Sequence, residues 1–204
     1  TIVWARRFAG YKRADLLLHD KVRFEKLLNN PKYPVQIIWA GKPYPMDYSA
    51  ISTFNTLVEE SKYYKNMAVL TGYELSLSKS LKQGSDLWLN NPRVPREASG
   101  TSGMTAAMCG SVNLSTDDGW IPEFAKNGIN GFVTPQADYD NTSVYDQDNF
   151  DLENLYQVLE NEILPMYYDR PDEWRKVQQN AMDDVKLAFN SDRMADEYYQ
   201  QIYQ

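Results

Sequence analysis

The sequence predicts an α/β fold in which one parallel β-sheet is covered by helices on both faces. Short apolar segments alternate with segments of helical spacing through the first 135 residues, which is the pattern of a parallel sheet with crossover helices. The run 35–40 (VQIIWA) is almost wholly apolar, as is typical of a strand buried on both faces. Right-handed crossovers bring the carboxyl ends of such strands to one edge, where ligands bind.

Each element follows from a local signal. The first residues, IVWA, form a strand, and the chain begins in it without a preceding cap, which suggests a fragment of a longer protein. Turns containing glycine or proline separate the later segments. The expected strands are 2–5, 35–40, 67–70, 86–89, 111–115 and 132–135. The expected helices in this part are 14–28, 46–62, 74–82 and 104–110.

The last third of the chain is expected to be helical. Residues 136–150 are polar and are interpreted as a connection. Apolar residues then keep helical spacing over 152–163, 174–188 and 191–202, and Ser191 is the expected N-cap of the last helix. We therefore divide the chain into a core at 1–135 and a helical extension at 136–204 that packs on the same domain.

The composition and the cysteine content limit the class of protein to which this chain can belong. The 204 residues are 43% hydrophobic and 24% charged, which is ordinary for a soluble globular protein, and no apolar run is long enough to span a bilayer. The one cysteine, Cys109, cannot form an internal disulfide, so a reducing, cytoplasmic setting is expected. Its apolar neighbours predict a small buried side chain rather than a nucleophile.

Several kinds of catalytic site are not expected. His19 is the only histidine and is interpreted as a helix residue, so no Ser-His-Asp set is expected. No metal-binding cluster is visible, because the pair Asp117–Asp118 precedes a glycine and is better interpreted as a turn.

The charge is unevenly distributed. Residues 1–135 carry 16 Lys and Arg against 12 Asp and Glu, whereas residues 136–204 carry 5 against 16. The first thirteen residues contain four cations and no acid. We expect a local anion site there rather than a nucleic-acid surface, which needs a broader basic face. The alternative interpretation is that these four cations, Arg6, Arg7, Lys12 and Arg13, form a surface basic cluster.

A second loop, 97–110 (EASGTSGMTAAMCG), carries a carboxylate and a glycine-containing turn before a helix-compatible run. Glu97 could accept hydrogen bonds from sugar hydroxyls. Backbone N–H groups near Gly100 and Thr101 could hold a phosphate at the helix start. The alternative is a structural connection between a strand and a helix.

These residues resemble the glycogen/α-glucan phosphorylases. EASGTSGM is similar to the family signature EASGTS-x-M-K, which opens the helix that carries pyridoxal phosphate. ARRFAGYKR, WAGKPYP and GYELSL resemble three further family segments within residues 1–135, and NSDRMADEYYQQIY resembles the closing helix of many such enzymes. The resemblance implies a GT-B glycosyltransferase, with two Rossmann-like domains across a cleft, of which this chain is the C-terminal one.

The resemblance also implies roles for individual residues. The reaction would be reversible transfer of glucose between an α-1,4-glucan and phosphate, with retention, in which a clamped phosphate protonates the leaving oxygen and stabilises an oxocarbenium-like cation. The catalytic residues that bind the substrate phosphate would be Arg7 and Lys12. The residues that hold the glucosyl hydroxyls would be Glu97, Ala98, Ser99 and Gly100. The residues near the cofactor phosphate would be Arg6, Tyr73 and Thr101.

One position departs from the family pattern. The lysine that forms the Schiff base with pyridoxal phosphate is replaced by Thr105. A hydroxyl cannot form an imine with an aldehyde, so covalent attachment of the cofactor is excluded at this position. The cofactor then binds without a covalent bond, or another anion replaces it, or phosphorolysis has been lost.

Two other functions remain open. Glycogen and starch synthases have a similar Arg-x4-Lys loop and Glu-x-x-Gly turn, which Arg7/Lys12 and Glu97/Gly100 also fit, so a nucleotide sugar could be the donor. A non-catalytic glucan-binding domain is the third interpretation. The expected partners are an α-glucan or maltooligosaccharide, phosphate or glucose 1-phosphate, and an N-terminal GT-B domain. A homodimer is also compatible with the sequence, and the fragment alone is expected to be inactive.

Overall fold

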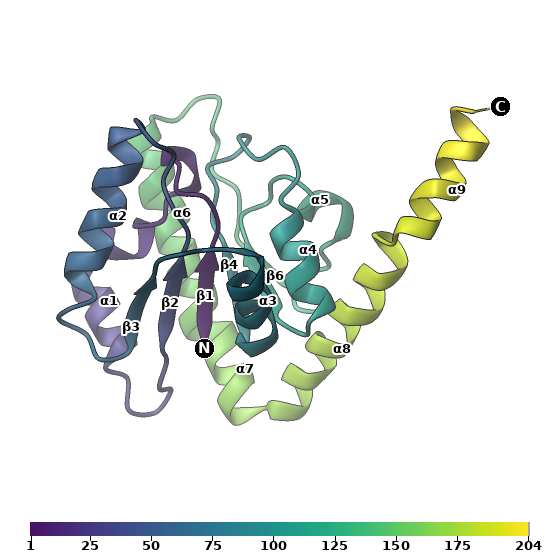
Figure 1. Cartoon of the computed structure of the whole chain (residues 1–204). Helices are drawn as coiled ribbons and strands as arrows, with labels where there is room; N and C mark the ends of the chain where they lie inside the picture. The colour runs from purple at the N-terminus through teal and green to yellow at the C-terminus, as the bar shows by residue number, and fades with distance from the viewer. Residues whose placement is uncertain (204) are drawn as a thin grey trace.

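A computed structural model describes residues 1–203 and contains one six-stranded sheet in which every pairing is parallel (Figure 1). The strand order is β3-β2-β1-β4-β5-β6, so the chain reverses its direction of travel across the sheet after β3. This confirms the predicted α/β class and its Rossmann-like sheet. The strands are β1 (Ile2–Ala5), β2 (Ile37–Ala40), β3 (Met67–Leu70), β4 (Leu87–Asn90), β5 (Val112–Ser115) and β6 (Phe132–Val133).

Strands β1 and β4 lie at the centre of the sheet, and all of their residues are buried. They pair with Ile2 beside Leu87 and Val3 beside Trp88, so their carboxyl ends meet at one edge. The loops that follow β1 and β4 are the two segments singled out in the sequence. The strand order therefore places them side by side, although they are more than 80 residues apart.

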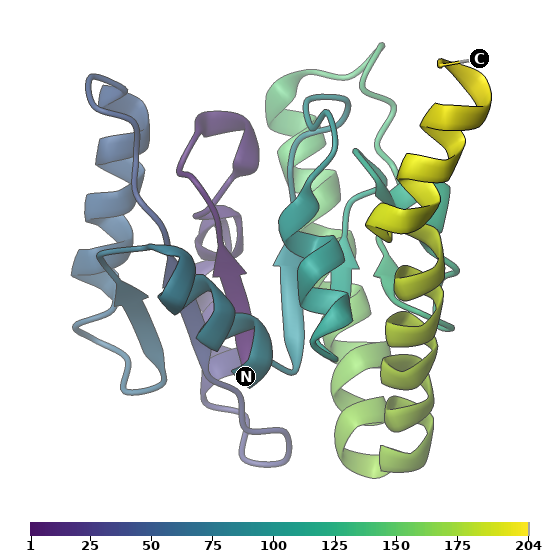
Figure 2. The same ribbon diagram turned by 45° about the vertical axis from the view of Figure 1, so that its right-hand side comes forward.

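Helices cover both faces of the sheet (Figures 1 and 2). Apolar residues of α1, α2, α6 and α7 join the larger core on one face, and those of α3 and α4 form the smaller core on the other face. The helices are η1 (Gly10–Lys12), η2 (Leu16–His19), α1 (Lys21–Leu28), α2 (Tyr48–Glu60), α3 (Leu75–Gly84), α4 (Thr101–Met108), α5 (Ile121–Phe124), α6 (Val144–Val158), η3 (Leu159–Ile163), α7 (Leu164–Asp169), α8 (Pro171–Ala188) and α9 (Ser191–Gln201).

Several helix boundaries differ from the predicted ones, and a polar cap accounts for three of the differences. The predicted helix 14–28 is divided into η2 and α1, because the Asp20 side chain accepts a hydrogen bond from the Arg23 N–H and starts a new helix. The predicted connection 136–150 is wrong in its second half, because Ser143 caps α6, which begins at Val144. Asn190, rather than the predicted Ser191, caps α9.

Cys109, which was expected to be buried, and the last helix, which was expected to pack on the domain, are both exposed. Cys109, predicted to be a small buried hydrophobe, is exposed at the C-cap of α4. Helix α9 extends away from the rest of the molecule (Figure 1). None of its residues 191–201 is buried, although it carries Met194, Tyr198 and Tyr199. Among residues 1–203, no helix combines the length and the apolar character needed to cross a membrane.

Arg13 connects the loop after β1 to the loop after β4. Its guanidinium, almost wholly buried, pairs with the carboxylates of Asp148 and Asp151 on α6 at 2.9 and 2.7 Å. It also donates hydrogen bonds to the carbonyl oxygens of Asn91 and Pro92, both at 2.9 Å. Burial raises the pKa of the Asp151 carboxyl, and the positive charge of Arg13 opposes that shift. Arg13 is therefore a structural cation rather than a free anion ligand.

We expect Arg13→Ala to lower the free energy of unfolding by about 3–5 kcal/mol, because Asp151 would remain buried without its partner. Arg175→Ala is the matched control. It removes an exposed ion pair with Asp172, for which about 0–1 kcal/mol is expected. Urea denaturation of the two variants measures the difference, and equal losses would contradict the structural role given to Arg13.

Candidate active site

Lys12 and Glu97 form an ion pair at the carboxyl edge of the sheet. The Lys12 Nζ lies 3.0 Å from Oε1 and 2.7 Å from Oε2 of Glu97, so the ammonium contacts both carboxylate oxygens. Lys12 is 9% exposed, and the Glu97 side chain is 12% exposed. The ammonium also lies over the Tyr11 ring, 5.0 Å from its centroid. The pair joins the loop after β1 to the loop after β4.

Arg6 is the second cation beside this carboxylate. Its Nη1 is 3.8 Å from the Glu97 Oε2, its Nη2 donates to the Leu89 carbonyl at 3.4 Å, and its guanidinium lies 5.6 Å from the Trp4 ring centroid. Among residues 1–203, its Nε has no hydrogen-bond partner and is buried. Burial lowers the pKa of Arg6 to about 10, and the Glu97 carboxylate opposes this shift. Arg6 therefore stays charged at neutral pH.

The turn that carries Glu97 is held by the loop after β5. The Glu97 N–H donates to the Asp118 Oδ2 at 2.9 Å, and the Trp120 N–H donates to the Ser99 carbonyl at 2.9 Å. Gly119 has φ +63°, and a Cβ there would lie 2.3 Å from the Ser99 oxygen. Only glycine allows this approach of the two backbones. Asp118–Gly119 is thus a turn, as predicted, and it also positions the candidate site.

Helix α4 starts directly after this turn. Gly100 adopts a left-handed conformation with φ +95° at the N-cap, and Thr101 is the first helical residue. Ala98, Ser99 and Thr101 are exposed, so this turn is open to solvent beside the buried ion pair. One turn into the helix, Thr105 is exposed, and its hydroxyl donates to the carbonyl oxygens of Thr101 and Ser102 within the helix, both at 3.1 Å.

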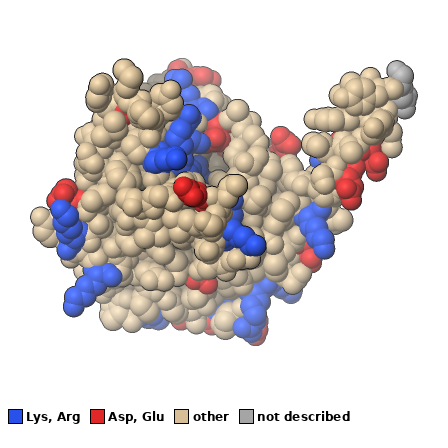
Figure 3. Space-filling view, viewed as in Figure 1, with Lys and Arg blue, Asp and Glu red and all other residues tan. Residues whose placement is uncertain are grey.

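Arg7, in the same loop as Lys12, lines a hollow that Lys12 does not line. Arg7 is exposed, and Lys42, Tyr44 and Tyr73 also line this open hollow of about 440 Å³. The Tyr73 hydroxyl bonds to the Ala5 carbonyl at 3.4 Å and to the Ser78 hydroxyl at 3.1 Å. Figure 3 shows one group of Lys and Arg side chains in the upper middle of the view, where Figure 1 places the loops beyond the carboxyl ends of the strands.

The residues singled out in the sequence thus form two neighbouring groups. Lys12, Arg6 and Glu97 are in contact, and the turn from Ala98 to Thr101 continues from Glu97. Arg7 and Tyr73 line the hollow instead. Thr105 belongs to neither group, because its hydroxyl is bonded within α4.

Sequence reasoning missed the residues that support the site. Asp118 was interpreted only as a turn residue. Its carboxylate accepts a hydrogen bond from the Glu97 N–H, and no local sequence pattern indicates a contact between residues so far apart. The Arg93 N–H donates to the Tyr11 carbonyl at 2.7 Å, and the Arg93 guanidinium pairs with Asp148 at 2.6 Å. Both contacts join segments that only the tertiary fold brings together.

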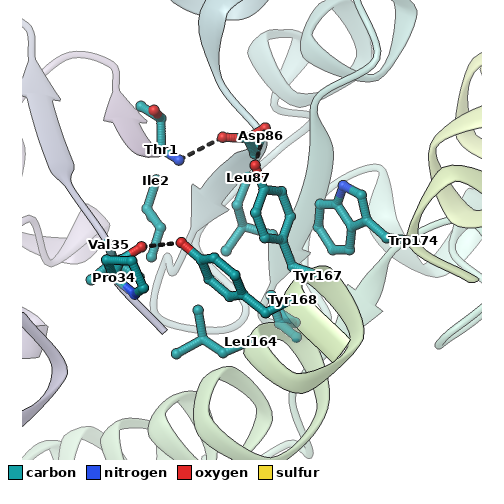
Figure 4. A pocket seen from close by; sticks show the side chains of 11 residues that line it. Thr1, Ile2, Pro34, Val35, Asp86, Leu87, Leu164, Tyr167, Tyr168 and Trp174 are labelled. Atoms are coloured by element: carbon teal, nitrogen blue, oxygen red, sulfur yellow. Dashed lines mark hydrogen bonds and ion pairs between the residues drawn. The ribbon is translucent and has the colours of Figure 1, made fainter. Parts of the chain in front are cut away.

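A second cavity lies at the opposite, amino-terminal edge of the sheet (Figure 4). Its volume of about 30 Å³ is that of a single water molecule. Asp86, the polar side chain at its mouth, already accepts a hydrogen bond from the Tyr167 hydroxyl at 3.2 Å. This cavity is too small for a sugar or a phosphate ester. Residues 1–203 contain no group of His, Cys, Asp and Glu side chains that could hold a metal ion.

We expect Gly119→Ala to destabilise the protein and to displace the Glu97 turn. The left-handed conformation costs about 1–2 kcal/mol for alanine, and the contact with the Ser99 oxygen adds roughly 1–3 kcal/mol. Gly128→Ala is the matched control, because Gly128 has φ +72° and open space around the position of its Cβ. Thermal unfolding of both variants measures the difference, and equal shifts in Tm would contradict the close approach at Gly119.

No protein-family model matches the chain. An uncharacterized protein of Methanocaldococcus jannaschii is 45% identical over all 204 residues. A maltodextrin phosphorylase of Thermococcus litoralis is 40% identical over 99% of the chain, and a glycogen phosphorylase of Aquifex aeolicus is 37% identical over 100% of it. The chain spans only 37%, 24% and 30% of the lengths of these three relatives.

Solved structures show the same fold. The structure of Anabaena HepE in complex with UDP and glucose superimposes with a TM-score of 0.70 at 14% identity, and HepE in complex with UDP superimposes with a TM-score of 0.73 at 15% identity. Each match covers nearly the whole chain and 48% of HepE. At this level of identity the likeness concerns the fold alone. The chain is therefore homologous over its whole length to part of the glycogen and maltodextrin phosphorylases, and it has the fold of one half of a GT-B glycosyltransferase.

Proposed function

We propose that this chain is the phosphate- and donor-binding half of an α-glucan phosphorylase-type enzyme, which transfers glucose between an α-1,4-glucan and phosphate with retention. The homology supports the glycosyltransferase and phosphorylase family. The observation that carries the finer proposal is the pairing of Lys12 with Glu97 beside Arg6, at the edge of a parallel sheet where ligands bind.

The residue types suit the two halves of such a substrate. In this proposal, Lys12 supplies a point charge for a phosphate oxygen, and the exposed Arg7 supplies a planar fork that can close on the same group. Glu97 accepts hydrogen bonds from glucosyl hydroxyls, together with backbone groups of the turn Ala98–Gly100. The N–H groups at the start of α4 add the positive end of the helix dipole.

The residues do not fit pyridoxal phosphate in its usual covalent form. Thr105 stands where the family lysine would form the imine, and its hydroxyl is bonded within its own helix. A cofactor held without a covalent bond would depend on Arg6, Tyr73 and Thr101 for its phosphate.

A nucleotide-sugar donor is the second candidate. Two observations favour it, namely the threonine at position 105 and the hollow lined by Arg7, Lys42, Tyr44 and Tyr73. That hollow offers cations for phosphate groups and aromatic rings for a flat base. In this case the Arg7–Lys12 loop would hold a diphosphate, and transfer would go to the glucan without free phosphate.

Both proposed functions include a second domain, because the chain spans well under half of the length of its relatives. We propose that this domain faces the carboxyl edge of the sheet and closes the site. Helix α9 is suited to contact it. It leaves the body of the domain (Figure 1) and exposes Met194, Tyr198 and Ile202 at 46%, 46% and 63%.

We expect Lys12→Ala to weaken the binding of inorganic phosphate by about tenfold or more, since a charge-assisted contact is lost. Lys62→Ala is the matched control, because Lys62 forms an exposed ion pair with Glu59 on α2. Calorimetry on the full-length protein measures both affinities, and circular dichroism checks the fold. Unchanged affinity in Lys12→Ala would remove Lys12 from the anion site.

The assay that separates the two enzyme candidates uses the full-length protein with maltooligosaccharide. Phosphate release from glucose 1-phosphate, measured with and without added pyridoxal phosphate, supports the phosphorylase. Transfer of glucose from a nucleotide glucose without such release supports the synthase-like alternative. Binding of maltooligosaccharide without transfer from either donor would contradict both and leave a glucan-binding domain.

A further inference from the structure

We infer that Glu97 has a second role, as the internal counter-ion that occupies Lys12 until an inorganic phosphate or phosphate ester arrives. When the anion binds, the Glu97 carboxylate is released toward the sugar hydroxyls, so that the anion and the glucosyl unit bind cooperatively. This inference rests on the proposed function of the site and names a coupling residue within it.

The geometry of the ion pair favours this exchange. Both carboxylate oxygens of Glu97 lie within 3.0 Å of the Lys12 ammonium, which is itself about nine-tenths buried. The ammonium has three N–H donors, so a phosphate oxygen that binds the third would lie directly beside the Glu97 carboxylate. Two anions side by side on one ammonium repel each other, so the carboxylate turns away when the phosphate enters.

The local charges favour an incoming anion. Arg6 and Lys12 are both buried and contact one carboxylate, that of Glu97, among the salt bridges of residues 1–203. The Arg6 Nε, buried and without a hydrogen-bond partner in the same part of the chain, is a donor that an anion in this place could satisfy. A phosphate carries a charge of about −1.5 to −2 at pH 7 and three or more acceptor oxygens, so it balances the two cations better than one carboxylate does.

The turn allows the Glu97 side chain to move without moving the backbone. The Glu97 N–H stays bonded to Asp118, and the adjacent Ser99 carbonyl stays bonded to the Trp120 N–H. Rotation about the Glu97 side-chain bonds is therefore enough to carry the carboxylate from Lys12 to the exposed side of the turn, where Ala98 and Ser99 face solvent.

Cooperativity follows by thermodynamic linkage. A phosphate that frees Glu97 makes a hydrogen-bond acceptor available to the sugar, and a sugar that holds Glu97 leaves Lys12 free for phosphate. Each ligand then raises the affinity of the other by the same factor, within the range of about 5–150-fold that is usual for coupled sites.

The test is calorimetric titration of the full-length protein with inorganic phosphate, in the absence and presence of saturating glucose. In the wild-type protein, we expect glucose to tighten phosphate binding by at least about fivefold. In Glu97→Gln, which keeps the size of the side chain but removes its charge, phosphate alone should bind at least about tenfold tighter. Glucose should no longer change that affinity. Glu59→Gln, in the exposed pair with Lys62, should behave as the wild type.

The outcomes separate this inference from the proposed function. Glu97→Gln that is folded by circular dichroism but binds phosphate no tighter than the wild type overturns the counter-ion role, even if Lys12→Ala loses phosphate binding as expected. If Glu97→Gln does not fold, the wild-type titrations decide alone, and phosphate affinity that is independent of glucose overturns the coupling. Wild-type protein that does not bind phosphate at all contradicts the proposed phosphate site itself.

Discussion

The need of each buried cation for a carboxylate governs the architecture around the carboxyl edge of the sheet. Lys12 and Arg13 are adjacent in the sequence and both are buried, but they are neutralised from different directions. Lys12 pairs with Glu97 after β4, and Arg13 pairs with Asp148 and Asp151 on α6. An uncompensated charge in such a place would be strongly destabilising. The loop after β1 is therefore held between two other segments of the chain.

This arrangement gives the short loop after β1 a defined geometry. Arg13 and Asn91 fix the backbone by exchanging hydrogen bonds with each other's segments, since Arg13 Nε donates to the Asn91 carbonyl and Asn91 Nδ2 donates to the Arg13 carbonyl. The side chain of Lys12 then projects from a fixed backbone toward Glu97. Asp118 and Gly119 hold the Glu97 turn in the same way from the other side. Arg13, a structural cation, and Lys12, the proposed ligand-binding cation, are thus neighbours with separate partners.

The family motifs can be recognised in the sequence, whereas the contacts that support the site cannot. EASGTSGM and ARRFAGYKR indicated two loops that the structure brings into contact through Lys12 and Glu97. The replacement at Thr105 is also visible in the sequence alone, and it bears on the cofactor whatever the fold. The burial of Cys109 was predicted wrongly, because apolar neighbours in the sequence do not show which side of α4 faces the core. The missed start of α6 has a local cause, the Ser143 cap within a polar segment.

The sequence by itself determined the class of the fold and the identity of the two loops. Alternation of apolar runs with helical spacing is a local property, and a parallel sheet is its consequence. Only the tertiary structure decided which charges meet. Glu97 lies 85 residues from Lys12, and Asp151 lies still further from Arg13. Each cation had several possible partners in the sequence. The strand order β3-β2-β1-β4-β5-β6 removed that ambiguity for Lys12, because it places the ends of β1 and β4 side by side. The packing of α6 beside the loop after β1 did so for Arg13.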